Sequence, residues 1–224
     1  MTQTQFEPKI FTFDEFIEWY PEDSLFRYEL HNGAIVEMPK PRGKHSNLTG
    51  CLIERLLITI REMGKGGIWT IPRESIVKPS RESGYEPDII VLNKETLGLE
   101  TRWASESIIQ NATSVKLIVE VVSSNWRDDY YDKLRDYEEM EINEYWIVED
   151  TALDGFPGLK QVSVDYAALG GKKFIGNPKI PTISVCVLVD GEYQVSKFTG
   201  NTQIISPTFP QFNFTAQQVF DLAN

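Results

Sequence analysis

Two short runs of apolar, largely β-branched residues stand out along the chain. They are Pro87–Leu92 (PDIIVL) and Val115–Val122 (VKLIVEVV). Runs of this length and composition are typical of strands buried on both faces. A third such run, Glu144–Glu149 (EYWIVE), follows the charged segment Arg127–Glu141, whose pattern predicts a helix. A strand, a helix and a strand in this order predict a crossover unit, which should be right-handed.

Apolar residues at steps of three and four predict the clearest helix of the chain, which ends at Gly64. Its stripe, interrupted by Arg55, is Leu48, Cys51, Leu52, Leu56, Thr59, Ile60 and Met63. Two shorter helices are predicted by capping boxes, in which a threonine is followed three residues later by Glu or Gln. Thr12 and Glu15 open the first, over about Phe13 to Tyr20, and Thr215 and Gln218 open a C-terminal one.

Turn signals predict two hairpins. His31-Asn32-Gly33 separates Phe26–Leu30 from Ala34–Met38, and Asn-Gly between such runs is the strongest short hairpin signal. Asp190-Gly191 joins Thr182–Val189 to Glu192–Phe198 in the same way. We expect His31 to be a polar turn residue.

The segment between the first long helix and the second central strand is less regular. Trp69–Val77 alternates in polarity and predicts a strand with an edge or a bulge at Pro72. Asn93–Ser114 is polar, with a short helix expected near residues 105–110. The chain has no repeat, low-complexity tract or linker. We therefore expect one α+β domain over residues 1–224, in which a mixed central β-sheet is flanked by helices, with an N-terminal hairpin and a β-rich extension over 151–224.

The net charge of −11 argues against non-specific nucleic-acid binding, but the charge is uneven. Residues 39–81 carry nine basic and three acidic side chains, a net charge of +6. A bound polyanion should lie near this segment, which includes Lys40, Arg42 and Lys44; the alternative is a solvated basic face. Two isolated cysteines, the absence of a signal-peptide pattern and of an apolar run of about 20 residues predict a cytoplasmic protein without a membrane span.

Asp88 and Glu120 each interrupt an otherwise apolar strand. A buried carboxylate costs several kcal/mol unless it is paired or protonated, so two of them on adjacent strands can share a cation. Mg²⁺ takes oxygen ligands and keeps several waters, so two protein carboxylates are enough. Glu120 should share a strand face with Ile118 and Val122. The alternative is two strand-end acids satisfied by backbone donors or an arginine.

The helix after Glu120 carries a candidate partner for the two acids. Asp129, Lys133 and Tyr137 stand four residues apart and so share one face. Lys133 could orient or deprotonate a water, or stabilise charge on a phosphate. The alternative is an exposed Asp129–Lys133 pair on the helix surface.

These motifs, in this order, resemble the PD-(D/E)XK nuclease superfamily, and more closely its Uma-type restriction endonuclease group. The resemblance covers residues 12 to 150 and rests on the following segments: Arg27-Tyr28-Glu29-Leu30 with Gly33 and Met38, His45, Pro87-Asp88-Ile89-Ile90, Val119-Glu120-Val121-Val122-Ser123, the Asp129-Lys133-Tyr137 spacing and Glu144-Tyr145-Trp146. The group commonly has Ser-Pro after the Glu-Val segment, whereas this chain has Ser123-Ser124. That difference changes the loop before the helix that carries Lys133.

The resemblance implies a restriction-endonuclease-like core, Mg²⁺- or Mn²⁺-dependent hydrolysis of DNA and a homodimer. By position, Asp88 and Glu120 would be metal ligands. The superfamily lysine position is occupied by Val122. The Uma-type group places its lysine on the following helix instead, and Lys133 occupies that position. Glu29 resembles an additional acid that orients Lys133 or binds metal through water. His45 is a further site candidate, and Asp129 and Tyr137 would support the site.

Three functions remain open at this point. The first is a metal-dependent deoxyribonuclease. The second is a catalytically inactive protein of the same fold that binds nucleic acid or assembles with a partner, and the third is a different metal-dependent phosphoesterase. The sequence lacks a His-rich zinc site, a Gly-rich phosphate loop before a helix and a nucleophile-elbow serine.

Overall fold

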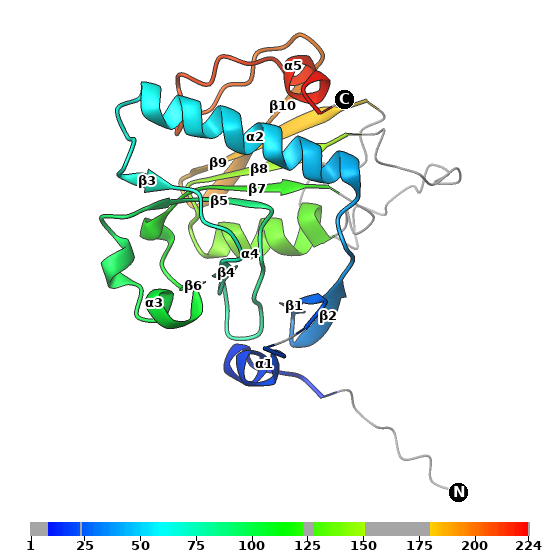
Figure 1. The fold of residues 1–224 in the computed structure, drawn as a ribbon, viewed down its shortest axis with the longest axis vertical. Helices are drawn as coiled ribbons and strands as arrows, with labels where there is room; N and C mark the ends of the chain where they lie inside the picture. The colour runs from blue at the N-terminus through cyan, green and yellow to red at the C-terminus, as the bar shows by residue number, and fades with distance from the viewer. Residues whose placement is uncertain (1–8, 23, 123–127, 151–179, 224) are drawn as a thin grey trace, which may run out of the picture.

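A six-stranded mixed sheet forms the centre of the computed structural model, which describes residues 9–22, 24–122, 128–150 and 180–223 (Figure 1). The strand order is β10-β9-β8-β7-β5-β3, and only the central β7–β8 pair within this sheet is parallel. The strands are β3 (Trp69–Thr70), β5 (Ile89–Asn93), β7 (Val115–Val121), β8 (Glu144–Glu149), β9 (Thr182–Val189) and β10 (Glu192–Thr199).

Helices cover both faces of this sheet. The long helix α2 (Gly43–Glu62) and the C-terminal helix α5 (Ala216–Asp221) lie on one face, and α4 (Lys133–Glu139) lies on the other (Figure 1). A π-helical turn, Asp128–Asp132, leads directly into α4. The connection from β7 through α4 to the parallel strand β8 is the crossover that the pattern predicts.

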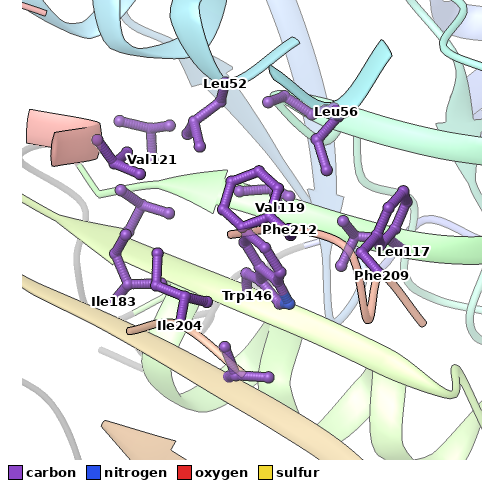
Figure 2. Close-up of a cluster of buried hydrophobic side chains, with 14 of the residues drawn as sticks. Leu52, Leu56, Leu117, Val119, Val121, Trp146, Ile183, Ile204, Phe209 and Phe212 are labelled. Atoms are coloured by element: carbon purple, nitrogen blue, oxygen red, sulfur yellow. The ribbon is translucent and has the colours of Figure 1, made fainter. Parts of the chain in front are cut away.

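The sheet separates two hydrophobic cores. The core under α2 and α5 is closed by aromatic side chains from β8 and the C-terminal segment (Figure 2). Its residues include Leu52, Leu56, Leu117, Val119, Val121, Trp146, Phe209 and Phe212. The core under α4 contains Ile118, Val122, Tyr137, Tyr145 and Ile147. Two-sided burial of this kind explains the nearly continuous apolar runs of β5, β7 and β8.

The N-terminal part packs beside the sheet as a smaller third cluster. It comprises α1 (Phe13–Trp19) and the hairpin of β1 (Arg27–His31) and β2 (Ala34–Met38). An isolated bridge between Leu30 and Gly84 ties the hairpin to the chain just before β5. Two residue pairs, β4 (Ile76–Val77) and β6 (Ile108–Ile109), form a small parallel sheet next to it. The remaining short helices are η1 (Leu97–Leu99), α3 (Trp103–Glu106) and η2 (Ala112–Ser114).

The local signals at chain ends and turns are confirmed. Both capping boxes are formed, at Thr12 and at Thr215. Both hairpins are present, with Asn32-Gly33 and Asp190-Gly191 at positive φ in the turns. The fold class, an α+β protein with a mixed central sheet, is confirmed as well.

Two predictions for the irregular region are wrong. Trp69–Val77 is not one strand: β3 joins the central sheet, β4 joins the small one, and the chain bends between them at Arg73 and Glu74. The helix expected near residues 105–110 lies earlier, because Ser107 adopts a left-handed conformation that ends α3 and lets Ile108–Ile109 extend as β6.

Some expectations fall outside the described residues. They include the Ser123-Ser124 loop, Arg127 at the start of the predicted charged helix, and residues 151–179 of the predicted β-rich extension. Within the described ranges, none of the helices combines the length and the apolarity that a membrane span requires.

Candidate active site

The β5–β7 pairing brings Asp88 and Glu120 together. Ile89 pairs with Val119 in this antiparallel ladder, so continuing the register by one residue sets Asp88 opposite Glu120. The Asp88 carboxylate accepts a hydrogen bond of 2.8 Å from the backbone N–H of Val121. Asp88 therefore lies just before the first residue of β5, beside the residue that follows Glu120.

Alternation along β7 aims Glu120 toward α4. Val119 and Val121 belong to the core under α2, whereas Ile118 and Val122 belong to the core under α4. Because successive side chains of a strand point to opposite faces, Glu120 emerges on the α4 side. The predicted face of Glu120 is confirmed, and its carboxylate is almost completely buried there.

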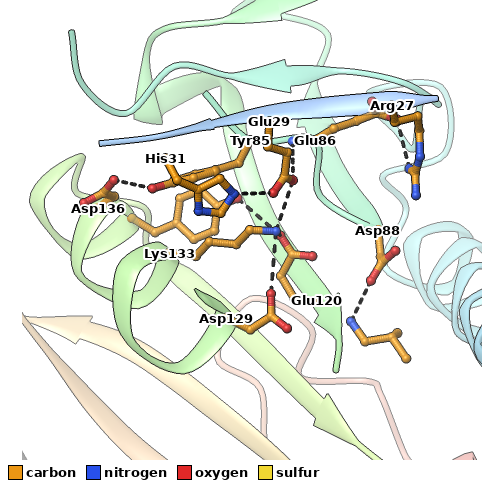
Figure 3. Close-up of polar contacts among 12 residues, drawn as sticks. Arg27, Glu29, His31, Tyr85, Glu86, Asp88, Glu120, Asp129, Lys133 and Asp136 are labelled. Atoms are coloured by element: carbon orange, nitrogen blue, oxygen red, sulfur yellow. Dashed lines mark hydrogen bonds and ion pairs between the residues drawn. The ribbon is translucent and has the colours of Figure 1, made fainter. Parts of the chain in front are cut away.

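Lys133 joins three carboxylates at the start of α4 (Figure 3). Its Nζ lies 3.0 Å from Glu120 Oε1, 3.1 Å from Glu29 Oε1 and 3.6 Å from Asp129 Oδ1. The lysine side chain is only 3% exposed. The alternative of an exposed Asp129–Lys133 pair is therefore wrong. We call Glu29, Asp88, Glu120, Asp129 and Lys133 together the carboxylate cluster.

Glu29 reaches the cluster from β1 and is fixed by two further donors. The backbone N–H of Glu86 donates to Glu29 Oε1 at 2.9 Å, and His31 Nε2 lies 2.8 Å from Glu29 Oε2. His31 is thus a buried residue at the end of β1, which corrects the expectation of a polar turn residue. Its spacing of two from Glu29 on a strand, which places both on one face, was the signal in the sequence that could have identified this contact.

The two glutamates differ in their electrostatic surroundings. Burial raises the pKa of Glu29, but Lys133, His31 and the Glu86 N–H outweigh it and hold that pKa below its usual value. The pKa of Glu120 is raised well above its usual value, because burial and the charges of Asp129, Asp88 and Glu29 outweigh Lys133. Burial is the largest of these causes, and the charges of three further acids add to it.

Lys133 is held as an ammonium ion by this charge. Burial lowers its pKa, but the nearby Glu120, Glu29 and Asp129 raise it well above its usual value. A lysine in this state can donate hydrogen bonds and stabilise negative charge, whereas it cannot accept a proton. Of the roles that the sequence left open, orienting a water or stabilising charge fits this environment better than deprotonation.

A ring of buried side chains fixes the position of α4 around Lys133. Tyr137 OH donates to Glu120 Oε1 at 3.4 Å, one turn after Lys133, as the predicted spacing requires. Tyr85 OH donates to Asp136 at 2.6 Å, and its ring makes edge contacts with His31 and Tyr137. Tyr85 and Asp136 were missed by the sequence reasoning, because they come from separate segments that meet only in the fold.

His45 supports Asp88 from the first turn of α2. Its Nε2 lies 3.1 Å from Asp88 Oδ2, and both side chains are largely buried. Burial lowers the pKa of His45, but the hydrogen bond and the charge of Asp88 outweigh it and raise that pKa above its usual value. The predicted involvement of His45 thus takes the form of a contact to the candidate metal ligand.

The basic residues Lys40, Arg42 and Lys44 lie just before and within the first turn of α2, with exposed side chains. In the described part of the chain they form no ion pair with the carboxylate cluster. They stand next to His45 in sequence, so they flank the site without forming part of it.

The donor chemistry of the cluster fits a hard divalent cation. Three carboxylates contact Lys133, and the charge of a fourth, Asp88, acts on Glu120. Over the described ranges, no set of three or more His, Cys, Asp or Glu side chains is arranged to hold a metal by itself. Mg²⁺ commonly binds through one or two carboxylates, waters and substrate phosphates. Asp88 and Glu120 are the residues that would hold such an ion.

Comparisons with known proteins point to one family. The family model Uma2, described as "Putative restriction endonuclease", matches residues 13–217. A crystal structure of a putative nuclease belonging to DUF820 from Anabaena variabilis ATCC 29413 superimposes with a TM-score of 0.66 at 16% identity. The match covers 96% of this chain and 99% of that one, so the two share a fold. No curated protein matches the chain.

Proposed function

This chain belongs to the Uma2 family of putative restriction endonucleases, and from that premise we propose that it is a metal-dependent deoxyribonuclease that hydrolyses phosphodiester bonds. The observation that carries the proposal is the contact of Lys133 with both Glu29 and Glu120, beside Asp88. The lysine of α4 and the acids of β1 and β7 thus meet near the start of β5.

In the proposed reaction, water attacks a phosphodiester phosphorus and one P–O ester bond breaks. A proton from the water ends on the leaving oxygen, so the products are a phosphomonoester and an alcohol. Asp88 and Glu120 would hold Mg²⁺ or Mn²⁺, which supplies Lewis-acid chemistry and lowers the pKa of bound water. Lys133, kept as an ammonium ion, orients the attacking water and stabilises the negative charge that develops on the phosphate. Glu29 and Asp129 fix the position of the ammonium group.

The alternative is an inactive protein of the same fold that binds nucleic acid or assembles with a partner. The net charge of −11 favours it, because an acidic chain has no long-range attraction for DNA. The site favours the active enzyme, because Lys133 contacts Glu29 and Glu120, and Asp88 accepts a hydrogen bond from the residue that follows Glu120. We propose in addition that the protein is a homodimer.

Cleavage of supercoiled plasmid and of single-stranded DNA in Mg²⁺ or Mn²⁺ tests the proposal. We expect the wild type to nick DNA, EDTA to abolish the activity, and Asp88→Asn, Glu120→Gln and Lys133→Met to reduce it by at least about a hundredfold. Circular dichroism of each variant separates loss of activity from loss of folding. A wild type that cleaves neither substrate would leave the inactive binding protein as the better description.

Metal binding is measured separately by isothermal titration calorimetry. Mn²⁺ should bind the wild type and bind Asp88→Asn at least about tenfold more weakly, since only one of the two carboxylate ligands remains. The exposed Asp190 lies in the turn between β9 and β10, the two strands at one edge of the sheet, away from the β5–β7 pair that holds the site. Asp190→Asn therefore makes the same chemical change away from the site and should leave Mn²⁺ affinity unchanged.

A further inference from the structure

Two of the three hydrogen-bond donors of Lys133 are used by protein carboxylates. Its ammonium group donates to Glu29 and Glu120, and the Asp129 carboxylate lies 3.6 Å away. Its side chain is also only 3% exposed. A DNA phosphate that enters the site therefore needs a second cation that faces solvent and still has donors available.

Arg27 lies beside the carboxylate cluster and meets both requirements. It precedes Glu29 by two residues on β1, so the two side chains leave the same face of the strand. Figure 3 shows Arg27 and Asp88 at the same end of the cluster, away from Asp136. The Arg27 side chain is 40% exposed, in contrast to the buried Lys133.

Glu86 holds the Arg27 guanidinium at this end of the site. Arg27 Nη1 donates to Glu86 Oε1 at 3.1 Å, and the backbone N–H of the same Glu86 donates to Glu29. Among the described residues this is the ion pair that Arg27 makes. A guanidinium has five N–H donors in a planar fork, so the others remain available to a ligand.

The charge around Arg27 also ties it to the site. Burial lowers its pKa, but the charges of Glu86, Asp88 and Glu29 outweigh it and raise the pKa. Asp88 is thus close enough for its charge to act on Arg27. A phosphodiester at a metal that Asp88 and Glu120 would hold is therefore expected near the same guanidinium.

We propose that Arg27 contacts the non-bridging oxygens of the phosphodiester at the carboxylate cluster, and that its ion pair with Glu86 occupies one of its donors until DNA binds. The inference rests on the proposed function for the identity of the substrate. Arg27 is then the substrate-binding cation, and Lys133 is the internal one. The planar fork of arginine matches two phosphate oxygens, which a lysine at position 27 would contact only as a point charge.

Binding of a fluorescein-labelled duplex oligonucleotide, measured by anisotropy in Ca²⁺ and again in EDTA, tests this role without cleavage. We expect Arg27→Met to weaken binding by about tenfold or more. In Arg27→Met the slope of log affinity against log salt should fall by about 1. The affinity of Arg27→Lys should lie between those of the wild type and Arg27→Met. Lys94→Met is the matched control: it removes one exposed charge after the opposite end of β5 and should change affinity less than about twofold.

Glu86→Gln separates phosphate contact from a merely structural ion pair. If Arg27 binds phosphate, removing the competing carboxylate leaves DNA affinity unchanged or higher. If Arg27 serves only to pair Glu86, then Glu86→Gln weakens binding as much as Arg27→Met, and the proposal is overturned. It is equally overturned if Arg27→Met binds like the wild type, or if the wild type binds no oligonucleotide.

Cleavage assays then distinguish the two proposals. A wild type that binds through Arg27 but does not cut DNA in Mg²⁺ or Mn²⁺ contradicts the nuclease and supports the phosphate contact. If the wild type cuts DNA and Arg27→Met has the same DNA affinity and the same KM, the phosphate contact is contradicted and the nuclease stands.

Discussion

Lys133 is buried among acids that depend on it for their charge balance, so its removal affects folding as well as catalysis. Lys133→Met leaves Glu29 and Glu120 buried without their shared cation. Breaking a buried ion pair from one side costs about 3–5 kcal/mol. We expect the free energy of unfolding of Lys133→Met, measured with urea at neutral pH, to fall by that amount.

A double-mutant cycle shows whether the destabilisation comes from the orphaned acid. Glu120→Gln combined with Lys133→Met removes both charges, so the double variant should be more stable than the sum of the two single effects by about 0.5–3 kcal/mol. Strictly additive effects would mean that the Lys133–Glu120 ion pair, at 3.0 Å, contributes nothing to stability.

The residues that the sequence identified differ from those it missed in a physical way. Asp88 and Glu120 are visible because a carboxylate inside an apolar strand has few structural uses, and Lys133 because helical spacing groups it with Asp129 and Tyr137. Arg27 and His31 stand on a half-exposed hairpin where charged and polar side chains are ordinary. Only the tertiary contacts to Glu86 and Glu29 single them out.

At the scale of elements, the crossover from β7 through α4 to β8 builds the site, and its strands and helix could be predicted from the sequence. Two-sided burial makes the strand signal strong, so β5 and β7 differ from their predicted bounds by only one or two residues. The separation of β3 from β4 could not be predicted. Two-residue strands have no period, and their partners are set by the sheet they join.

Gly84 lets α1 pack against the segment that leads into the site. A Cβ at this position would lie 2.6 Å from a ring carbon of Phe13, while the Gly84 backbone bridges Leu30 on the Glu29 strand. Overpacking of this kind typically costs about 1–3 kcal/mol. We expect Gly84→Ala to lower the melting temperature by several degrees.

Gly98 offers a matched comparison, since a Cβ there meets nothing within 4 Å. Gly98→Ala should leave the melting temperature within about a degree or two of the wild type. Equal stability of the two alanine variants would mean that the Phe13 ring moves aside at no cost, and that α1 is not firmly docked.

Glu144 anchors the C-terminal segment to β8. Its carboxylate accepts hydrogen bonds from Trp146 Nε1 at 2.6 Å, Ser206 Oγ at 2.6 Å and the Thr208 N–H at 2.9 Å. Glu144→Ala would leave these buried donors without an acceptor. Each unsatisfied donor costs about 1–3 kcal/mol of stability when no water takes the place of the carboxylate. Hydrogen exchange at Thr208 and Phe209 should therefore accelerate by at least about tenfold, ahead of exchange in α2.

At the scale of the whole molecule, the distribution of charge decides how an acidic protein meets DNA. The chain carries −11 overall, and residues 39–81 carry +6. His45 connects one end of that segment to Asp88, so Lys40, Arg42 and Lys44 are the exposed cations that precede the site along α2. The far end of α2, where Arg61 and Lys65 lie, is separated from the site end by a helix of 20 residues, which is about 30 Å long. Of the cations along α2, only those at its site end can contact a phosphodiester bound at the cluster.

Replacing Lys40, Arg42 and Lys44 together by glutamine should therefore weaken duplex binding and lower the salt slope by about 2–3, because each phosphate that a cation no longer neutralises lowers the slope by about 0.9. Folding should be unaffected to within about 0.5 kcal/mol per substitution, since these side chains are exposed. Glutamine at Arg61, Lys65 and Lys94 makes the same charge change at the far end of α2, where all three are exposed. If DNA lies along the end of α2 next to the site, only the substitutions at Lys40, Arg42 and Lys44 change the salt slope. If both sets of substitutions change it equally, the basic segment is a solvated face that attracts DNA without directing it to the carboxylate cluster.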